Sequence, residues 1–364
     1  MKEYDFLIVG AGLFGATFAY EATKRGKRCL ILEKRSHIGG NVYTKKIEGI
    51  DVHVYGPHIF HTNDENIWNY VNSLTPFKPF VNSPLSKVGD KYYHLPFNMY
   101  TFNEFWGVTT PEEAMRKIES ERIDVPNPVT LEEQALSTVG KDFYNTFIKG
   151  YTEKQWGRKC SELPAEILKR IPLRFRYDND YFDAAFQGIP ENGYTELIEK
   201  ALAKAEVLKE TDYFDFILGH KGIAEKTIYT APIDRYFDYC FGKLEYRTVT
   251  FDTETLDVKD YQPAAVVNYP SSDIPYTRII EHKRFNYFDT DKTVISKEYS
   301  EEWKETSEPY YPINNEKNAA LYAKYAALAE KETNVYFCGR LGSYKYADMD
   351  VTVKDALDLA NRLL

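Results

Sequence analysis

The sequence predicts an α/β protein that opens with parallel strands. Two short apolar runs, at residues 6–9 and 29–32, flank a stretch at 14–24 that can form a helix, and a glycine-rich turn joins the first run to that stretch. Unbroken apolar runs are typical of parallel strands that are buried on both faces. Gly26 is well placed to end the helix. The opening segment is therefore predicted to be a β–α–β unit.

Helices are expected next, and strands after them. Thr110 and Thr130 each precede a stretch with acidic residues in its first turn, a pattern typical of helix N-termini. Residues 161–170 resemble a further short helix. From about residue 229 to 300, β-branched and aromatic residues alternate in part, as they do in strands. Helix, strand and helix are expected again over residues 315–364.

The opening β–α–β unit and the closing strand–turn–helix are expected to form one domain, with the middle of the chain inserted into it. We predict three domains, of which two are discontinuous. They are a nucleotide-binding domain of residues 1–80, 194–242 and 315–364, a helical domain of residues 100–170, and an antiparallel sheet domain of residues 81–99, 171–193 and 243–314.

Composition excludes several partners. The net charge of −9 repels nucleic acid and anionic membranes, so an anionic substrate needs a local cluster of Arg or Lys. No apolar run is long enough for a membrane span. The four cysteines are scattered without a CxxC pair, which fits a reducing, cytoplasmic setting. His58 and His61 have no carboxylate or thiol at ligand spacing, so no metal site is predicted.

The glycine-rich turn contains Gly10, Gly12 and Gly15 in the spacing GxGxxG, after a strand and before a helix. The first glycine permits a tight turn, the second lets the backbone approach a pyrophosphate, and the third lets the helix pack on the strand. Glu33 ends the second strand, where its carboxylate can accept hydrogen bonds from an adenosine ribose and would repel a 2′-phosphate. These residues predict a dinucleotide site that disfavours NADP.

FAD is favoured over NAD by two further segments. Lys34 is followed by Gly39, Gly40 and Asn41, which resemble the second glycine motif of FAD enzymes of the glutathione-reductase and amine-oxidase type. The pair at 339–340 follows a predicted strand and resembles the second cofactor contact of those enzymes. A last helix at 351–364, with Asp350 as its N-cap, would direct its positive end at the flavin pyrimidine.

Several segments combine arginine with aromatic residues, as a site for a nucleoside diphosphate requires. A base stacks on a ring, and guanidinium groups and Tyr hydroxyls bind the phosphates. Taken singly, each Tyr is equally consistent with a core position and each Arg with a surface charge. The sequence by itself does not show that these segments converge.

Over essentially its whole length, the chain resembles the bacterial UDP-galactopyranose mutases. The most specific segments are GPHIFHT at 56–62, YTEKQWG at 151–157 and DMDVT at 348–352. Other flavoenzymes share only the glycine motifs. The resemblance implies a Rossmann-like FAD-binding domain of the amine-oxidase type, an inserted helical domain with a mobile lid after it, and an antiparallel β-sheet domain.

The resemblance also implies the activity, that of an intramolecular transferase (a mutase). It would interconvert UDP-galactopyranose and UDP-galactofuranose for polysaccharide biosynthesis. Reduced FAD would attack galactose C1 through its N5 atom, UDP would leave and return, and there would be no net redox change. An external reductant such as NAD(P)H and a homodimeric state are implied as well.

Residue roles are carried over from the family. Arg170, on the lid, and Arg278 would grip the diphosphate from opposite sides, and His58 would lie beside the flavin. Substrate contacts would come from Asn82, Phe147, Tyr151, Thr152, Trp156, Tyr181, Asn268, Tyr311, Tyr346 and Asp348. Cofactor contacts would come from Gly10, Gly12, Phe14, Gly15, Glu33, Lys34, Gly39, Gly40, Asn41, His58, Gly339, Arg340, Asp348 and Met349.

Two rival functions remain open. A flavin oxidase or dehydrogenase of the amine-oxidase type would share the fold and cofactor but would take electrons from its substrate. A non-catalytic module like the GDP-dissociation inhibitors would share the fold without flavin, and the intact cofactor motifs disfavour it.

Overall fold

The computed structural model describes residues 2–170 and 173–364, with the backbone alone at positions 169 and 170. Its first sheet has five parallel strands, which confirms the predicted α/β class. In spatial order they are β10 (Glu206–Leu208), β2 (Cys29–Leu32), β1 (Tyr4–Val9), β11 (Ala224–Tyr229) and β17 (Val335–Phe337). The sheet is thus assembled from both ends and the middle of the chain.

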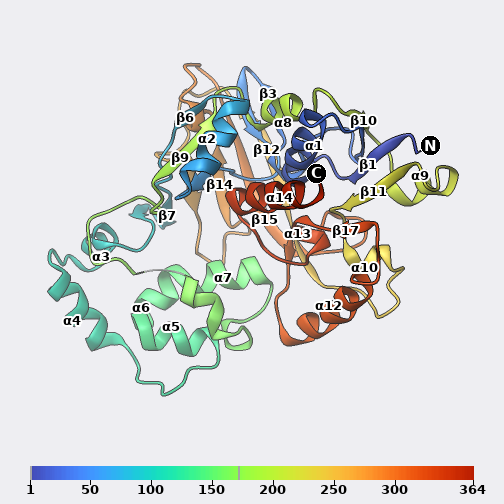
Figure 1. Cartoon of the computed structure of the whole chain (residues 1–364). Coiled ribbons are helices and arrows are strands. Elements are labelled where there is room, and N and C mark those ends of the chain that lie inside the picture. The colour runs from blue at the N-terminus through green and yellow to red at the C-terminus, as the bar shows by residue number, and fades with distance from the viewer. Residues whose placement is uncertain (1, 171–172) are drawn as a thin grey trace.

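Helices cover both faces of this sheet because successive side chains of a strand point to opposite sides. Ile8 packs toward α1 (Leu13–Lys24), α8 (Tyr194–Leu202) and α14 (Met349–Leu363). Leu7 points the other way, toward α9 (Tyr213–Gly219). Figure 1 shows the C-terminal helix α14 lying beside α1, so the two ends of the chain close one core.

A second sheet of seven strands stands beside the first. Its spatial order is β16 (Tyr311–Pro312), β12 (Tyr246–Leu256), β15 (Thr293–Glu302), β14 (Arg278–Glu281), β13 (Val266–Asn268), β7 (Leu85–Val88) and β8 (Lys91–His94). Every neighbouring pair is antiparallel except β7 with β13, which is parallel. This sheet brings Asn268 and Arg278 to facing positions in adjacent strands.

Two small sheets connect the larger parts. They pair β3 (Thr44–Ile47) with β4 (Ile50–His53), and β9 (Phe186–Pro190) with both β5 (Phe60–Thr62) and β6 (Phe77–Pro79). The helix α2 (Glu65–Leu74) joins β5 to β6. Strand β9 therefore pairs with strands from the first 80 residues rather than with the seven-stranded sheet, and the domain boundaries given above stay a prediction.

The helical region contains α3 (Met99–Trp106), α4 (Pro111–Glu121), α5 (Leu131–Val139), α6 (Lys141–Phe143) and α7 (Lys149–Trp156). Capping boxes begin α4 at Thr110 and α5 at Thr130, as expected. Figure 1 shows α4, α5 and α6 gathered on one side of the molecule, with α7 between them and the strands, where α7 contacts β15.

The remaining helices are short or lie near the C-terminus. They are α10 (Ile233–Tyr236), α11 (Lys283–Asn286), α12 (Glu316–Ala329) and α13 (Gly339–Gly342), with a 3₁₀ turn at Gly40–Val42. In the part of the chain that the structure describes, no helix has the length and apolar character needed to cross a membrane.

Local structure differs from the sequence prediction at two places, and a π-helical segment adds a third irregularity. Residues 161–170 form two 3₁₀ segments, Cys160–Glu162 and Ala165–Arg170, instead of one helix, because Pro164 lies between them and pairs with Thr130 as a β-bridge. A π-helical segment, Tyr144–Ile148, precedes α7 and shifts its register. Asp350 is not the N-cap of α14; Asp348 is, because its carbonyl accepts the first helical hydrogen bond from Thr352.

Candidate active site

One cavity of about 2280 Å³ runs between the two large sheets and the helical region. Ordinary small-molecule pockets measure roughly 300–1,000 Å³, so this cavity has room for two ligands of nucleotide size. Every site residue predicted from the sequence lines it except Arg170, whose side chain lies outside the described residues. The segment just before Arg170, residues 161–167, also contributes to the lining.

The glycine loops form a cradle that no side chain could share. A Cβ on Gly15 would lie 2.2 Å from the carbonyl oxygen of Gly10. A Cβ on Gly40 would lie 2.9 Å from the Cα of Gly12, so the two glycine motifs touch each other. Such a backbone surface suits the pyrophosphate of a dinucleotide, and it fits an extended flavin nucleotide because both motifs take part.

Glu33 stands at the end of β2 as predicted, and its carboxylate is already hydrogen-bonded. Its Oε2 accepts from the backbone N–H of Ala11 and its Oε1 from that of Arg35, both at 2.9 Å. Each carboxylate oxygen has a second lone pair, so contact with a ribose stays possible. The two bonds also fix the carboxylate at the start of the first glycine loop.

The N-terminus of α14 opens onto the same cavity, where Met349 and Thr352 line the wall. The side chain of Asp348 does not cap the helix; its Oδ1 accepts a hydrogen bond of 3.0 Å from the Tyr346 hydroxyl. Asp350 instead binds the N–H of Val351 within the first turn. The positive end of the helix dipole favours a group that gains negative charge.

His58 is held in one tautomer at the cavity wall. Its Nδ1 lies 2.7 Å from the carbonyl oxygen of Gly56, which can only accept, so Nδ1 carries the proton and Nε2 is an acceptor. Burial lowers the pKa of His58 to about 4, and the positive charges of Arg340 and Arg278 add to that effect. At neutral pH, His58 is therefore an uncharged hydrogen-bond acceptor and not an acid.

Two further histidines support the His58 loop from behind. The backbone N–H of His58 donates to Nδ1 of His53 at 3.1 Å, and the backbone N–H of His53 donates to Nδ1 of His282 at 3.2 Å. His282 in turn contacts the hydroxyl of Ser296 at 2.7 Å through Nε2. A ring nitrogen that accepts an N–H is unprotonated, so both residues are built into the fold in their neutral form.

This arrangement predicts acid sensitivity. Burial lowers the pKa of His282 to about 3 and that of His53 well below its usual value. The histidines of the unfolded chain take up protons near pH 6.5, whereas those of the folded chain stay neutral. Their contribution to stability is therefore fully present above pH 6.5 and is lost as the pH falls toward 3. At pH 5 the free energy of unfolding should be lower by about 2 kcal/mol through His282 alone, and His53 adds to that loss. Urea unfolding at pH 7.5 and 5.0 measures the difference.

The matched variants are His282→Gln, which should reduce the loss at pH 5 by about 2 kcal/mol while His53 and His58 still contribute, and His220→Gln. His220 is exposed and directly follows the last residue of α9, so its replacement should leave the pH dependence unchanged. An equal drop in all three proteins would contradict the assignment.

Arg278 begins β14 beside a buried carboxylate. Its Nε and Nη2 both lie 2.7 Å from Oε2 of Glu298, and Oε1 of Glu298 accepts from the hydroxyl of Thr277 at 3.1 Å. Burial acts against the charged form, but the carboxylate of Glu298 raises the pKa of Arg278. The guanidinium is thus permanently charged and oriented, and no described residue takes a hydrogen bond from its Nη1. That edge is available to an anion.

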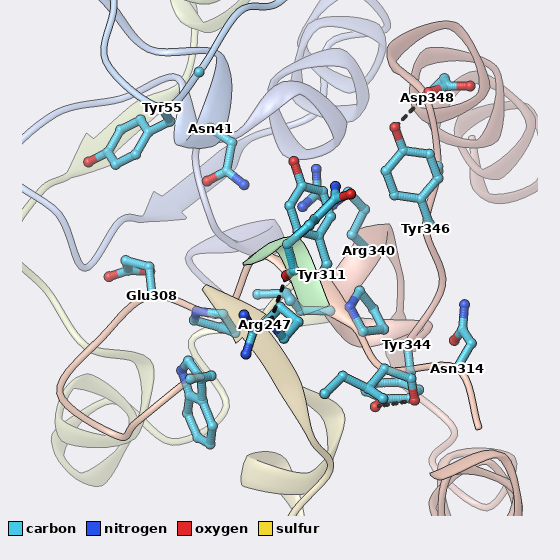
Figure 2. A pocket seen from close by; sticks show the side chains of 18 of the residues that line it. Asn41, Tyr55, Arg247, Glu308, Tyr311, Asn314, Arg340, Tyr344, Tyr346 and Asp348 are labelled. Atoms are coloured by element: carbon cyan, nitrogen blue, oxygen red, sulfur yellow. Dashed lines mark hydrogen bonds between the residues drawn. The ribbon is translucent and has the colours of Figure 1, made fainter. Parts of the chain in front are cut away.

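Arg340 stands among the tyrosines that were expected at the substrate. Its guanidinium lies 5.4 Å from the ring centre of Tyr311 and 5.9 Å from that of Tyr346. Figure 2 shows these three side chains close together, with the hydrogen bond from Tyr346 to Asp348. Arg340 was predicted as a cofactor residue; the structure places it beside two tyrosines that were predicted to bind the substrate. A cation surrounded by hydroxyl groups is suited to phosphate oxygens.

Comparison with known proteins decides the family. The sequence profile described as UDP-galactopyranose mutase matches residues 146–346, and one described as an NAD(P)-binding Rossmann-like domain matches residues 8–74. The chain is 44% identical over its whole length to a probable UDP-galactopyranose mutase of Klebsiella pneumoniae, covering 96% of that protein.

The chain belongs to the UDP-galactopyranose mutase family. It is therefore an isomerase of the kind that uses a flavin cofactor.

Other relatives of this mutase chain widen the comparison. It is 40% identical to a dTDP-fucopyranose mutase of Escherichia coli, with 97% of each chain covered. A crystal structure of reduced UDP-galactopyranose mutase superposes with a TM-score of 0.77 at 14% identity, covering 100% of this chain and 94% of the other. A putrescine oxidase superposes with a TM-score of 0.60 at 11% identity, covering 99% and 98%. These two likenesses show the fold.

Two buried charged groups in or behind the cavity wall were missed by the sequence analysis. Glu298 faces Arg278 across β14 and β15, a pairing that only the sheet register reveals. Arg247 lines the cavity with 4% of its surface exposed, donating to the carbonyl of Gln155 at 3.1 Å and the hydroxyl of Ser300 at 3.2 Å. No described carboxylate lies within ion-pair distance of Arg247, so its charge is available to a ligand.

A third group, Glu308, bridges the two sides of the cavity in this mutase. It pairs with Lys34 at 3.1 Å and with Arg35 at 2.9 Å, at the end of β2. Figure 2 shows Glu308 on the loop before β16, across from Tyr55 and Asn41. The guanidinium of Arg35 also stacks 4.6 Å from the ring centre of Tyr55. Lys34, expected to contact the cofactor, therefore has a protein partner as well.

The other predicted substrate residues differ in how far they face the cavity. Phe147 is 4% exposed and packs against Phe143 and Tyr93 in the aromatic core of the helical region. Tyr181 is 43% exposed, and its backbone N–H donates to the carbonyl of Asn82 at 2.9 Å. Within the described residues, no group of three His, Cys, Asp or Glu side chains could hold a metal ion.

Proposed function

We propose that the protein interconverts the pyranose and furanose forms of UDP-galactose, with reduced FAD as its cofactor. One observation supports this most: the glycine cradle and the cluster of Arg278, Arg340 and Tyr311 share a single cavity. The cradle suits the diphosphate of FAD, and the cluster suits the diphosphate of a second nucleotide. The two would then meet with the sugar between them.

When bound, reduced FAD would supply the nucleophile for galactose C1 through its N5 atom. Arg278 holds the diphosphate through the guanidinium edge that Glu298 leaves open, and it stabilises the negative charge on departing UDP. Arg170, whose side chain lies outside the described residues, would grip the diphosphate from the other side, as the resemblance to the family implies. A lid that closes there would keep water from the reacting carbon.

His58 contributes an acceptor rather than a proton. Its Nδ1–H is bound to Gly56, so Nε2 can accept a hydrogen bond from the cofactor. The positive end of α14 lies on the same cavity and favours the electron-rich form of the flavin. The two features together favour a reduced cofactor.

The remaining polar and aromatic residues bind the nucleotide and the sugar. Tyr181, Tyr311 and Tyr346 donate to phosphate oxygens, Tyr151 stacks on the uracil with Phe147 behind it, and Trp156 lies at the ribose. Asn82, Asn268, Thr152 and Asp348 complete the substrate contacts. Cofactor contacts are the fourteen residues already named from the resemblance, from Gly10 to Met349.

A second substrate deserves the same assay, because a relative of 40% identity over 97% of the chain is named dTDP-fucopyranose mutase. Thymine carries one methyl group more than uracil, deoxyribose lacks the 2′-hydroxyl, and fucose lacks the 6-hydroxyl of galactose. All three differences concern the nucleoside and sugar ends, so the diphosphate cluster serves both substrates. The reaction class is the same in either case.

The test incubates dithionite-reduced protein with UDP-galactofuranose, and separately with dTDP-fucofuranose, followed by chromatography. We expect conversion of the first to its pyranose isomer, only with reductant and without oxygen uptake. Preferential conversion of the second would reassign the substrate. An oxidised product with oxygen uptake would indicate an amine-oxidase type of reaction, and a colourless protein without flavin absorbance would indicate a non-catalytic module.

The cellular setting follows from the same proposal. The enzyme would work in the cytoplasm as a homodimer, with NAD(P)H as the external reductant, and its product would enter polysaccharide biosynthesis.

A further inference from the structure

The helix α7 touches the loop between β13 and β14 through two residues on one face. A Cβ on Gly150 would lie 2.3 Å from the carbonyl oxygen of Pro270 and 3.2 Å from the backbone nitrogen of Ser272. Four residues later, and therefore on the same face, Lys154 points at the same loop. The backbones of helix and loop thus touch at Gly150 and are joined at Lys154.

Lys154 is bound by four main-chain carbonyls of that loop. Its Nζ lies 2.5 Å from the oxygen of Tyr269, 2.8 Å from Ser271, 2.9 Å from Ile274 and 3.0 Å from Tyr276. An ammonium has three N–H donors and no acceptor, so all of them are directed into the loop. The ammonium group of Lys154 therefore holds the backbone of the loop, and these four contacts fix its position.

Both elements carry predicted substrate residues into the cavity. The loop is preceded by Asn268 and followed by Arg278, while α7 carries Tyr151 and Trp156, and all four line the cavity. The ends of the loop are closed by the hydrogen bond from the N–H of Tyr269 to the carbonyl of Thr277, at 2.9 Å. A shift of α7 along this loop would change the distance between its ring residues and Arg278.

We propose that Lys154 is a positioning residue that sets the spacing between the nucleoside-binding face of α7 and the diphosphate-binding end of β14. The inference rests on the proposed function, which places the base at Tyr151 and the diphosphate at Arg278. A ligand that spans two half-sites gains affinity from their correct spacing, because binding of one half presents the other at high effective concentration. A ligand that occupies only one half-site does not depend on this spacing.

The test compares Lys154→Met with the flavin-loaded wild-type protein. Methionine keeps most of the length of the side chain but offers no donor. The ligands are UDP, uridine and inorganic pyrophosphate, measured by calorimetric titration and, for the weak ones, by ligand-detected NMR. We expect the dissociation constant for UDP to rise at least about tenfold, while those for uridine and pyrophosphate change less than about twofold.

Lys149→Met is the matched control. Lys149 lies on the same helix, does not line the cavity, and its ammonium donates no hydrogen bond to a described residue. This variant removes an equal charge and should bind all three ligands as the wild type does. In Lys154→Ala, added propylammonium should restore UDP affinity, since it replaces the missing part of the side chain, whereas propanol should not.

Two results would overturn the inference. Unchanged UDP affinity in Lys154→Met would show that the spacing does not depend on this residue. Equal weakening of all three ligands would show general damage to the site. Failure of the wild-type protein to bind UDP would contradict the proposed function, and this inference with it. The wild-type titration, which comes before any variant is compared, distinguishes that outcome.

Discussion

Replacing Arg278 by Met is expected to lower kcat at least about a hundredfold, because removing one oriented donor from a developing anion has effects of that size. The single change would leave Glu298, which is 5% exposed, as an unpaired buried carboxylate, and that can cost several kcal/mol of stability. The informative variant is therefore the double change Arg278→Met with Glu298→Gln, which removes both charges. Chromatographic turnover, thermal unfolding and flavin absorbance are measured together.

The control for that variant is Lys297→Ala, on the strand next to Arg278. Lys297 forms a partly exposed ion pair with Glu254 at 2.7 Å and does not line the cavity. Its loss should cost less than about 1 kcal/mol and leave turnover unchanged. A folded double variant with bound flavin and near-normal turnover would remove Arg278 from the mechanism.

Replacing Gly15 by Ala is expected to release most of the bound flavin. The added Cβ would lie 2.2 Å from the carbonyl oxygen of Gly10 and 3.1 Å from Cγ2 of Ile8. Helix α1 must then move away from β1, and its N-terminal N–H groups move away from the pyrophosphate. Overpacking of this kind costs about 1–3 kcal/mol. The ratio of visible to ultraviolet absorbance of the purified protein reports the flavin content.

Gly26→Ala is the control at the other end of the same helix. Gly26 has a positive φ of 78°, but nothing lies within 4 Å of an added Cβ. The change should cost about 1–2 kcal/mol of stability through the backbone alone and leave the flavin in place. Full flavin occupancy in Gly15→Ala would mean that the helix adapts without moving its N-terminus.

Features that depend on neighbouring residues could be predicted from the sequence. The apolar run at 29–32 is strand β2, and Thr130 with Glu133 forms the expected capping box. The glycine spacing identifies a cradle because each glycine is required by contacts within one turn of strand and helix. The resemblance to the family named the residues that line the cavity, although roles for them stay a proposal.

Prediction failed where a distant segment changes the local outcome. Residues 161–170 have a helical composition, yet Pro164 pairs with Thr130 and divides them into two 3₁₀ segments. Asp350 and Asp348 are both good N-caps by type, and the structure places the start of α14 directly after Asp348. Arg247 was not singled out in the sequence, and only the fold shows that the strand β12 that carries it is buried at that point.

The sequence by itself thus determined the β–α–β start, the flavin-type glycine loops and the family, because each rests on the identity and spacing of residues close together in the chain. The tertiary structure alone decided that Glu298 orients Arg278, that His53 and His282 are neutral, and that Lys154 joins α7 to the loop before Arg278. These depend on strand register and burial, which arise from contacts between residues far apart in sequence. No local pattern records such contacts, so they become visible only when the chain has folded.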